Sequence, residues 1–287
     1  MGPRPILRVF GPPLLCGVNF DLMAFSLSNL RREVDWNLKR VLGFSRGIKK
    51  KKLGDPTKLK TLFSEEQRQR FEALEQTYDL SVWSDLCSEK ELRYNLYYLD
   101  ICDRYLADEQ ASGPSLDIGS RNWYYIPALM SFCPGSWDGV EVDGNQRYLN
   151  MATRRTYAEH MSRLFAEARY RVCSVLDIHD RYRFITWFLP YVSRRPMIHS
   201  GLPDRFFQPE SLLKHTYEIL EPGGLLFIVN PDLEEADLQK KLLQDQELPF
   251  ESIGELYSDF PTDEVDVCFG FVVRKPAANP NGTADPT

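Results

Sequence analysis

Beyond Pro114 the sequence alternates between short apolar segments and longer amphipathic segments, and this alternation restricts the possible folds most strongly. The apolar segments have the length of β-strands, and turn-forming residues such as Pro134-Gly135 and Pro222-Gly223-Gly224 separate them from the helical segments. Strands and helices that alternate in this way form a mainly parallel sheet with helices on both faces. The sequence therefore predicts an α/β fold with a Rossmann-like, doubly wound sheet.

The apolar runs and the breaker residues between them predict the position of each element. Strands are expected at residues 115–118, 139–142, 171–176, 184–188, 225–229, 251–257 and 267–273. Helices are expected between them at residues 122–132, 153–168, 209–220 and around 239–245. A short polar loop joins the last two strands, so they are predicted to form an antiparallel pair at the edge of the sheet. Residues 196–207 are predicted to form a long loop that serves as a lid or as a substrate wall.

Two helical regions are predicted before the sheet. Ser64 and Gln67 have the spacing of a capping box, and residues 64–106 are predicted to form two or three helices. Ser28 is expected to cap an earlier helix that ends near residue 42. The apolar residues of this earlier helix fall on one stripe: Leu30, Val34, Leu38, Val41 and Leu42. This pattern favours a helix that docks on the protein's own domain over a membrane anchor.

Charge is distributed unevenly along the chain. Residues 1–62 contain 13 Lys or Arg and 4 Asp or Glu, a balance of +9, whereas the other residues have 22 basic and 37 acidic side chains, a balance of −15. The densest basic point is Lys49-Lys50-Lys51-Lys52. Residues 31–60 are therefore predicted either to contact nucleic acid or an acidic membrane surface, or to form a solvated linker.

The composition also argues against several classes of protein. The longest apolar runs are far shorter than the ~20 residues that cross a bilayer, so no transmembrane segment is expected. Six cysteines form no CxxC pair, and together with only four histidines they predict no metal site and reduced thiols in a cytoplasmic protein. The N-terminus lacks the clean apolar middle and cleavage site of a secretory signal, and Met23 is an alternative start.

Four parts are expected along the chain. They are a basic, partly helical or disordered arm at residues 1–62, a helical cap or extension at 63–112, the Rossmann-like domain at 113–275 and a disordered tail at 276–287. The 43% hydrophobic content is enough for a core in the main domain, whereas the tail is polar and rich in Pro, Gly and Asn.

Three ordered motifs in the main domain carry a resemblance to a known superfamily. Leu116-Asp117-Ile118-Gly119-Ser120 closes the first predicted strand, Asp143 follows the second, and residues 219–226 (ILEPGGLL) lead into the fifth. With these motifs in this order, residues 114–275 resemble the class I S-adenosylmethionine-dependent methyltransferase superfamily. The resemblance implies a Rossmann-like methyltransferase that binds S-adenosylmethionine beyond the carboxyl ends of the first strands.

The resemblance also implies roles for the residues that follow the first two strands. Asp117, Gly119 and Ser120 would face the amino-acid end of the cofactor. Asp143 would accept hydrogen bonds from the two ribose hydroxyls, since a carboxylate accepts at both oxygens. Glu141, two residues earlier on the same face of the strand, is the alternative for this role.

Residues after the third strand and in the first loop complete the implied site. Asp177 and Ile178 would contact the adenine. Arg121 and Trp123 depart from the superfamily pattern, because they occupy the positions of two further glycines in the loop. Glycine passes through positive φ and lets the backbone approach a ligand closely. The loop is therefore expected either to have a different shape or to turn these two side chains away from the cofactor.

The chemistry that the resemblance implies is an in-line displacement, in which a methyl group moves from sulfur to an oxygen or nitrogen nucleophile. Orientation of the reactants and exclusion of water supply most of the acceleration, and a base can remove the proton of the acceptor. His199, His179 and Tyr191 are the candidates for catalytic contacts. A small molecule is the expected acceptor.

Two other functions stay open at this point. One is a non-catalytic scaffold that binds S-adenosylmethionine without turnover, which the substituted glycine loop would suit. The other is a nucleic-acid-directed methyltransferase that uses the basic arm, although the acidic body argues against a large nucleic-acid surface.

Overall fold

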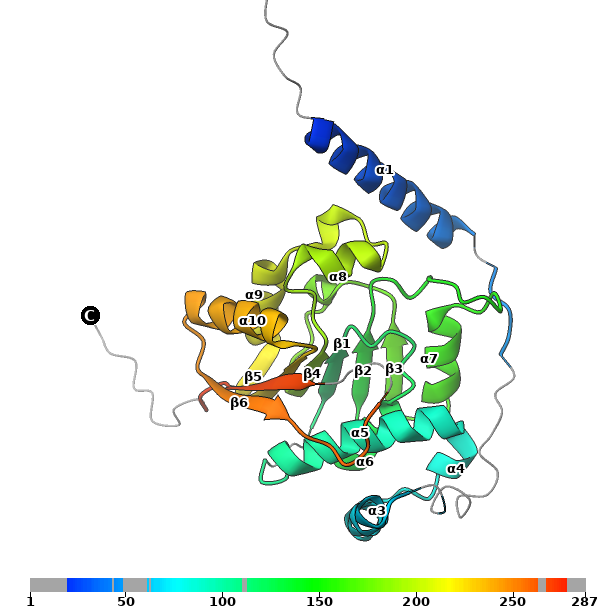
Figure 1. Ribbon diagram of the computed structural model, residues 1–287, viewed down its shortest axis with the longest axis vertical. Coiled ribbons are helices and arrows are strands. Elements are labelled where there is room, and N and C mark those ends of the chain that lie inside the picture. Colours follow the sequence, from blue (N-terminus) through cyan, green and yellow to red (C-terminus); the bar gives the residue numbers. More distant parts are fainter. Residues whose placement is uncertain are drawn as a thin grey trace, which may run out of the picture.

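The structure of the protein is a computed structural model (Figure 1). It describes residues 20–42, 44–48, 61, 63–109, 113–262 and 267–277. The lysine run at 49–52 and nearly all of the expected tail lie outside the described residues.

A seven-stranded sheet forms the centre of the molecule, with the strand order β3-β2-β1-β4-β5-β7-β6 (Figure 1). The strands are β1 Ser115–Ile118, β2 Trp137–Val140, β3 Ala168–Arg171, β4 Tyr182–Phe188, β5 Leu220–Asn230, β6 Phe250–Leu256 and β7 Cys268–Arg274. The first five strands are parallel, whereas β7 runs antiparallel to both β5 and β6. This arrangement confirms the predicted Rossmann-like, mainly parallel sheet and the antiparallel pair at its edge.

Helices surround the sheet and extend before it in the chain. They are α1 Phe20–Val41, α3 Glu65–Thr77, α4 Trp83–Leu86, α5 Glu89–Leu106, α6 Ile126–Phe132, α7 Arg154–Ser162, α8 Arg194–His199, α9 Pro209–Ile219 and α10 Leu233–Asp245. The predicted capping box of Ser64 and Gln67 starts α3, and Ser88 forms a second one with Glu91 at the start of α5. None of the described helices combines the length and the apolar character that crossing a membrane requires.

Alternate residues of the strands build two separate hydrophobic layers. Trp137, Phe184 and Phe227 contribute to a cluster that also contains buried residues of α5, α6 and α7. Leu116 and Ile185 contribute to a second cluster, on the other face, that contains residues of α9 and α10. Because both faces of a parallel sheet are covered, its strands consist of nearly continuous apolar runs, which is why the sequence located them.

Several predicted boundaries are wrong. The third strand is Ala168–Arg171 rather than 171–176, and a 3₁₀ turn, η1 Val175–Asp177, follows it. The Ser174 hydroxyl accepts a hydrogen bond from the Leu176 amide, which favours the turn over an extended strand. The predicted long loop at 196–207 contains the end of α8 and a second 3₁₀ turn, η2 Asp204–Phe206.

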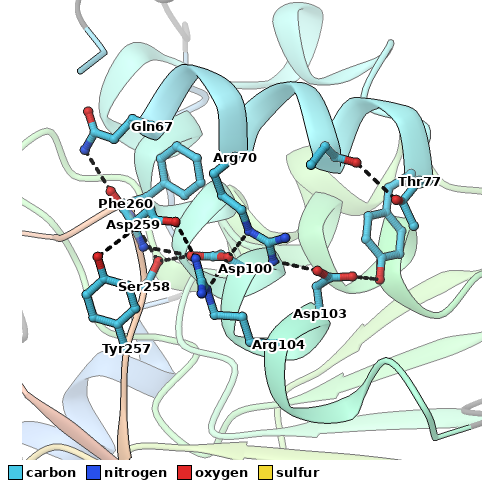
Figure 2. A network of polar contacts seen from close by, with 12 residues as sticks. Gln67, Arg70, Thr77, Asp100, Asp103, Arg104, Tyr257, Ser258, Asp259 and Phe260 are labelled. Carbon is cyan, nitrogen blue, oxygen red and sulfur yellow. Dashed lines mark hydrogen bonds and ion pairs between the residues drawn. The ribbon is translucent and has the colours of Figure 1, made fainter. Parts of the chain in front are cut away.

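A polar network ties the helices that precede the sheet to the loop between β6 and β7 (Figure 2). The fully buried carboxylate of Asp100, on α5, accepts hydrogen bonds from Arg70 on α3 at 2.6 Å and from Arg104 at 2.9 Å. The same carboxylate accepts the Ser258 hydroxyl at 2.7 Å and the Asp259 amide at 2.8 Å. Three segments distant in sequence therefore meet at one negative charge.

Candidate functional site

A cavity lies at the carboxyl ends of the central strands, where ligands of doubly wound sheets bind. Its walls come from the ends of β1, β2 and β4, from the turn after β3 and from the segment between α8 and α9. They are mostly apolar, and the polar side chains among them are Arg121, Glu141, Arg154, Ser174 and Tyr191. Such a cavity suits a mostly apolar ligand that a few polar groups orient.

The loop after β1 keeps a left-handed backbone at three alternate positions. Gly119 has φ = 71°, and Arg121 and Trp123 both have φ = 50°. A residue with a Cβ loses roughly 1–2 kcal/mol in this conformation. Glycine adopts this conformation without that cost, so all three positions have a backbone that suits glycine. The loop has the backbone of a glycine-rich loop, although two of its three positions carry large side chains.

The side chain of Trp123 packs into the core instead of the cavity. It is fully buried, its ring centroid lies 6.0 Å from that of Tyr170, and it is not among the residues that line the cavity. The ring lies over Gly139 on β2, since a Cβ built on Gly139 would come within 2.7 Å of it. Trp123 thus turns away from the proposed cofactor position, whereas Arg121 lines the cavity, so the expectation that the side chains turn away holds for Trp123 and is wrong for Arg121.

Gly139→Ala is expected to destabilise the protein by about 1–3 kcal/mol, because the added methyl group meets a fully buried ring that has no room to move. Urea unfolding measures the free energy change. In a cycle with Trp123→Leu, the two substitutions are expected to couple favourably, since the smaller side chain gives the methyl group space. A cost of Gly139→Ala below 0.5 kcal/mol, on the order of a surface substitution, would contradict this packing.

Glu141 is the acid that the end of β2 presents to the cavity. It is 6% exposed, and its two carboxylate oxygens accept one backbone hydrogen bond each, from Arg121 N at 2.9 Å and from Asp143 N at 2.7 Å. Arg154 Nη1 lies 3.7 Å from Glu141 Oε1. A carboxylate has about four lone-pair sites, so each oxygen can accept a further hydrogen bond. The loop and the strand thus hold Glu141 in a fixed orientation.

Asp143 lies beside this carboxylate but does not line the cavity. Its side chain is buried, Oδ2 accepts no hydrogen bond from the described residues, and Arg154 Nη1 lies 3.7 Å from it. Burial raises the pKa of Asp143 to about 6, against the opposing attraction of Arg154. A turn in which Gln146 N donates to Asp143 O takes the chain away from the strand at this point. The assignment of the ribose to Asp143 stays a prediction, and the geometry favours Glu141.

Asp117 points to the opposite face of the sheet from the cavity walls beside it. Its neighbours Leu116 and Ile118 belong to the α9–α10 layer, so the alternation of the strand directs Asp117 toward α5 and α6. Its oxygens accept hydrogen bonds from Tyr125 Oη and from Thr186 Oγ1, both at 2.8 Å. The side chain is fully buried, and this burial raises the pKa of Asp117 to about 7.

The raised pKa of Asp117 predicts a pH-dependent stability. The unfolded chain releases this proton near pH 4 and the folded chain near pH 7, so the folded form holds more protons between these values. Stability relative to Asp117→Asn is therefore expected to fall by about 3 kcal/mol between pH 5 and pH 8. Urea unfolding of both proteins at the two pH values measures this difference. A constant difference would mean that Asp117 titrates normally.

The other predicted cofactor contacts are distributed unevenly around the cavity. Gly119 lines it, whereas Ser120 is buried and its hydroxyl donates to Val140 O at 3.1 Å. Asp177 is exposed and accepts the Ser174 amide within η1, and Ile178 is fully buried in the α9–α10 layer. Neither of the last two lines the cavity, so their contact with adenine stays a prediction.

Of the three candidates for catalytic contacts, Tyr191 lines the cavity. Its hydroxyl shares a hydrogen bond with Ser200 Oγ at 2.5 Å. His179 and His199 are exposed and lie outside the cavity lining, so their roles stay predictions. Ser174 and Arg154 are cavity residues that the sequence analysis did not select. Arg154 pairs with Glu141 and Asp143, and the local sequence around Arg154 does not indicate this pairing.

The inner face of α1 covers one side of the cavity. Trp36, 7% exposed, packs in a small cluster with Met197 and Leu202, and its ring centroid lies 5.0 Å from that of Phe206. Leu202 and Phe206 also line the cavity. A residue of the N-terminal arm therefore supports the cavity wall.

Comparisons with known proteins find similarity to solved structures of low sequence identity. No family model and no curated protein matches this chain. A methyltransferase from Pyrococcus furiosus is 14% identical with a TM-score of 0.46, over 74% of this chain and 100% of its own. The N-methyltransferase NodS from Bradyrhizobium japonicum, solved with S-adenosyl-L-homocysteine, is 14% identical with a TM-score of 0.45, over 72% of this chain and 98% of its own. The likeness is one of fold.

The strand order gives the mainly parallel sheet with an antiparallel pair at its edge that the sequence predicted. β4 and β5 continue the parallel order beyond β1, and β7 is inserted antiparallel between β5 and β6. The chain has a Rossmann-like fold. Among the described residues, no cluster of three or more His, Cys, Asp or Glu side chains could hold a metal ion.

Proposed function

We propose that the protein is an S-adenosylmethionine-dependent methyltransferase that acts on an oxygen or nitrogen nucleophile of a small molecule. One observation carries the proposal. A buried carboxylate, Glu141, is fixed by two backbone amides at the end of β2 and faces an apolar cavity at the carboxyl edge of the sheet.

The residues present fit this cofactor. The remaining lone pairs of Glu141 suit the two hydroxyls of a ribose, which need an acceptor that donates nothing. Val142, Val175 and Leu212 give the cavity apolar walls that suit a purine, and Ser174 supplies a polar group beside them. Gly119 brings backbone to the cavity in a left-handed conformation, with open space around its Cα.

When bound, S-adenosylmethionine supplies an electrophilic methyl group for in-line displacement. The chain contributes orientation and the exclusion of water, since Trp187, Phe188 and Leu189 wall the cavity and Trp36 supports its cover. Tyr191 is the residue that we propose contacts the nucleophile, with its hydroxyl held by Ser200. This hydroxyl can accept a hydrogen bond from the acceptor and orient it.

An adjoining cavity supports a small-molecule acceptor. It shares Arg121 and Arg154 with the first cavity and extends past Tyr148 and Tyr124 toward the start of α5 at Lys90. Its lining combines aromatic rings with positive side chains. Both features favour a planar or acidic small molecule over a large polymer.

Calorimetric titration of the full chain with S-adenosylmethionine and S-adenosylhomocysteine tests the proposal, with ATP and NAD as nucleotide controls. We expect saturable binding of the first two and none of the controls. Transfer of labelled methyl groups to pools of small molecules, to RNA and to protein then identifies the acceptor class. Binding without any transfer would favour the non-catalytic scaffold, transfer to RNA would favour the nucleic-acid-directed enzyme, and the absence of binding would refute all three functions.

A further inference from the structure

The outer face of α1 is an exposed apolar stripe. Its described members are at least half exposed: Leu27 (67%), Leu30 (58%), Val34 (50%), Leu38 (51%) and Val41 (82%). Their spacing of three and four residues places them on one side of the helix. The stripe is therefore not the face by which the helix contacts the protein body. Leu42 and Phe44, just after the helix, are exposed as well.

The opposite face of α1 holds the helix on the protein body. Arg32 Nη2 lies 2.5 Å from Asp204 Oδ1, and Asn29 Oδ1 accepts the Asp204 amide at 2.9 Å. Glu33 pairs with Arg205, and Trp36 packs between α8 and η2. In Figure 1, α1 accordingly lies outermost, beside α8. The stripe is thus exposed while the helix is docked.

The end of α1 is fixed as well. Arg147 donates hydrogen bonds to the carbonyl oxygens of Lys39 at 3.3 Å and Phe44 at 2.8 Å. These contacts hold the segment after the helix against the body. The middle of the helix and its C-terminal end are therefore attached through polar contacts, and the apolar side chains of the stripe are left facing outward.

Positive charge accompanies the stripe. Arg31 is 85% exposed in its side chain and lies 3.8 Å from Asp35, and Arg46 is exposed just after the helix. Arg40 is exposed as well but lies over the ring of Trp36, on the docked side. In the sequence, four lysines follow at residues 49–52, so the arm is strongly basic whereas the rest of the chain is acidic. An apolar helical face beside basic residues is the pattern of helices that lie in the interface of anionic membranes.

We propose that the outer face of α1 docks on an anionic membrane surface. Each basic residue near such a surface attracts the anionic headgroups, and the apolar stripe enters the boundary between headgroups and acyl chains. A second copy of the chain fits less well, because two basic arms would repel each other. Nucleic acid fits less well too, since phosphate contacts leave the apolar stripe without a role.

Docking of this kind leaves the inner face of α1 in place. The polar contacts to Asp204 and Arg205 lie opposite the stripe. The helix can therefore meet a membrane while Trp36 stays packed against the cavity wall. Membrane binding and cofactor binding can therefore be measured independently. A negative result for one does not imply a negative result for the other.

Sedimentation of the full chain with vesicles of 30% phosphatidylserine in phosphatidylcholine, and with pure phosphatidylcholine vesicles, tests the proposal. We expect binding to the anionic vesicles that weakens strongly in 1 M salt, and little binding to the neutral ones. Val34→Glu is expected to weaken binding at least tenfold. Ser28→Glu, which adds the same charge at an exposed position about 120° around the helix from the stripe, is expected to weaken it less than threefold.

Circular dichroism and thermal unfolding establish that both variants stay folded. Absence of binding to anionic vesicles by the wild-type chain would overturn the proposal, and so would equal effects of the two substitutions. A wild-type dimer in analytical ultracentrifugation that Val34→Glu dissociates would also overturn it, because the stripe would then bind a second copy. RNA binding that Val34→Glu abolishes would assign the face to nucleic acid instead.

Discussion

Replacement of Glu141 with glutamine is expected to weaken the binding of S-adenosylmethionine by about 10- to 100-fold. Hydrogen bonds to a charged group contribute about 1.5–3 kcal/mol, and each 1.4 kcal/mol is a factor of ten in affinity. The amide of a glutamine accepts at one atom only, so it cannot serve both ribose hydroxyls and both backbone amides that Glu141 now accepts. Calorimetric titration of wild type and variant measures the change in dissociation constant.

Asp143→Asn is the matched control, because it makes the same chemical change two residues along the chain. Asp143 does not line the cavity, so this substitution is expected to change affinity less than threefold. Unfolding of both variants must be measured as well, since Glu141 also fixes the loop after β1. A larger loss of affinity in Asp143→Asn than in Glu141→Gln would return the ribose contact to Asp143.

The choice between these two acids shows where the sequence stops being informative. Residues 141 and 143 share one face of an extended strand, so their spacing cannot separate them. The separation depends on where β2 ends, at Val140, and on the turn that follows and carries Asp143 out of the cavity wall. Strand ends are set by tertiary contacts, which local composition does not reveal.

The sheet, by contrast, could be predicted in detail. Its parallel strands are buried on both faces, so each is an apolar run that turn residues delimit. The predicted third strand, at 171–176, overlaps the observed β3 at Arg171 alone. β3, at the edge, has the sequence ARYR, which has little to distinguish it from the neighbouring turn.

The orientation of α1 illustrates a different limit. The periodicity of its apolar residues correctly predicted a stripe, but periodicity alone does not reveal what the stripe contacts. The side that contacts the body is instead defined by Arg32, Trp36 and Asn29, each of which meets a partner about 170 residues away. The backbone of Arg121 is a similar case, because a left-handed φ outside glycine has no sequence signature.

Asp100→Asn is expected to lower the free energy of unfolding by about 3 kcal/mol, because loss of one partner of a buried ion pair leaves the others uncompensated. The carboxylate is fully buried and accepts four hydrogen bonds, two of them from Arg70 and Arg104 (Figure 2). Asparagine keeps the volume but loses the charge and places an N–H against donors. Urea unfolding measures the loss.

Asp103→Asn supplies the comparison, because Asp103 also binds Arg70 but is 18% exposed in its side chain and lies outside the contact with Ser258 and Asp259. Water can compensate part of its lost interaction, so its cost is expected to be about 1 kcal/mol. Equal costs for the two substitutions would mean that the buried carboxylate of Asp100 contributes no more to the free energy of unfolding than the partly exposed one of Asp103. A greater cost for Asp100 would instead identify it as the charge that holds α3 and α5 to the β6–β7 loop. It would thereby support the helical layer against which Trp123, in the loop after β1, is packed.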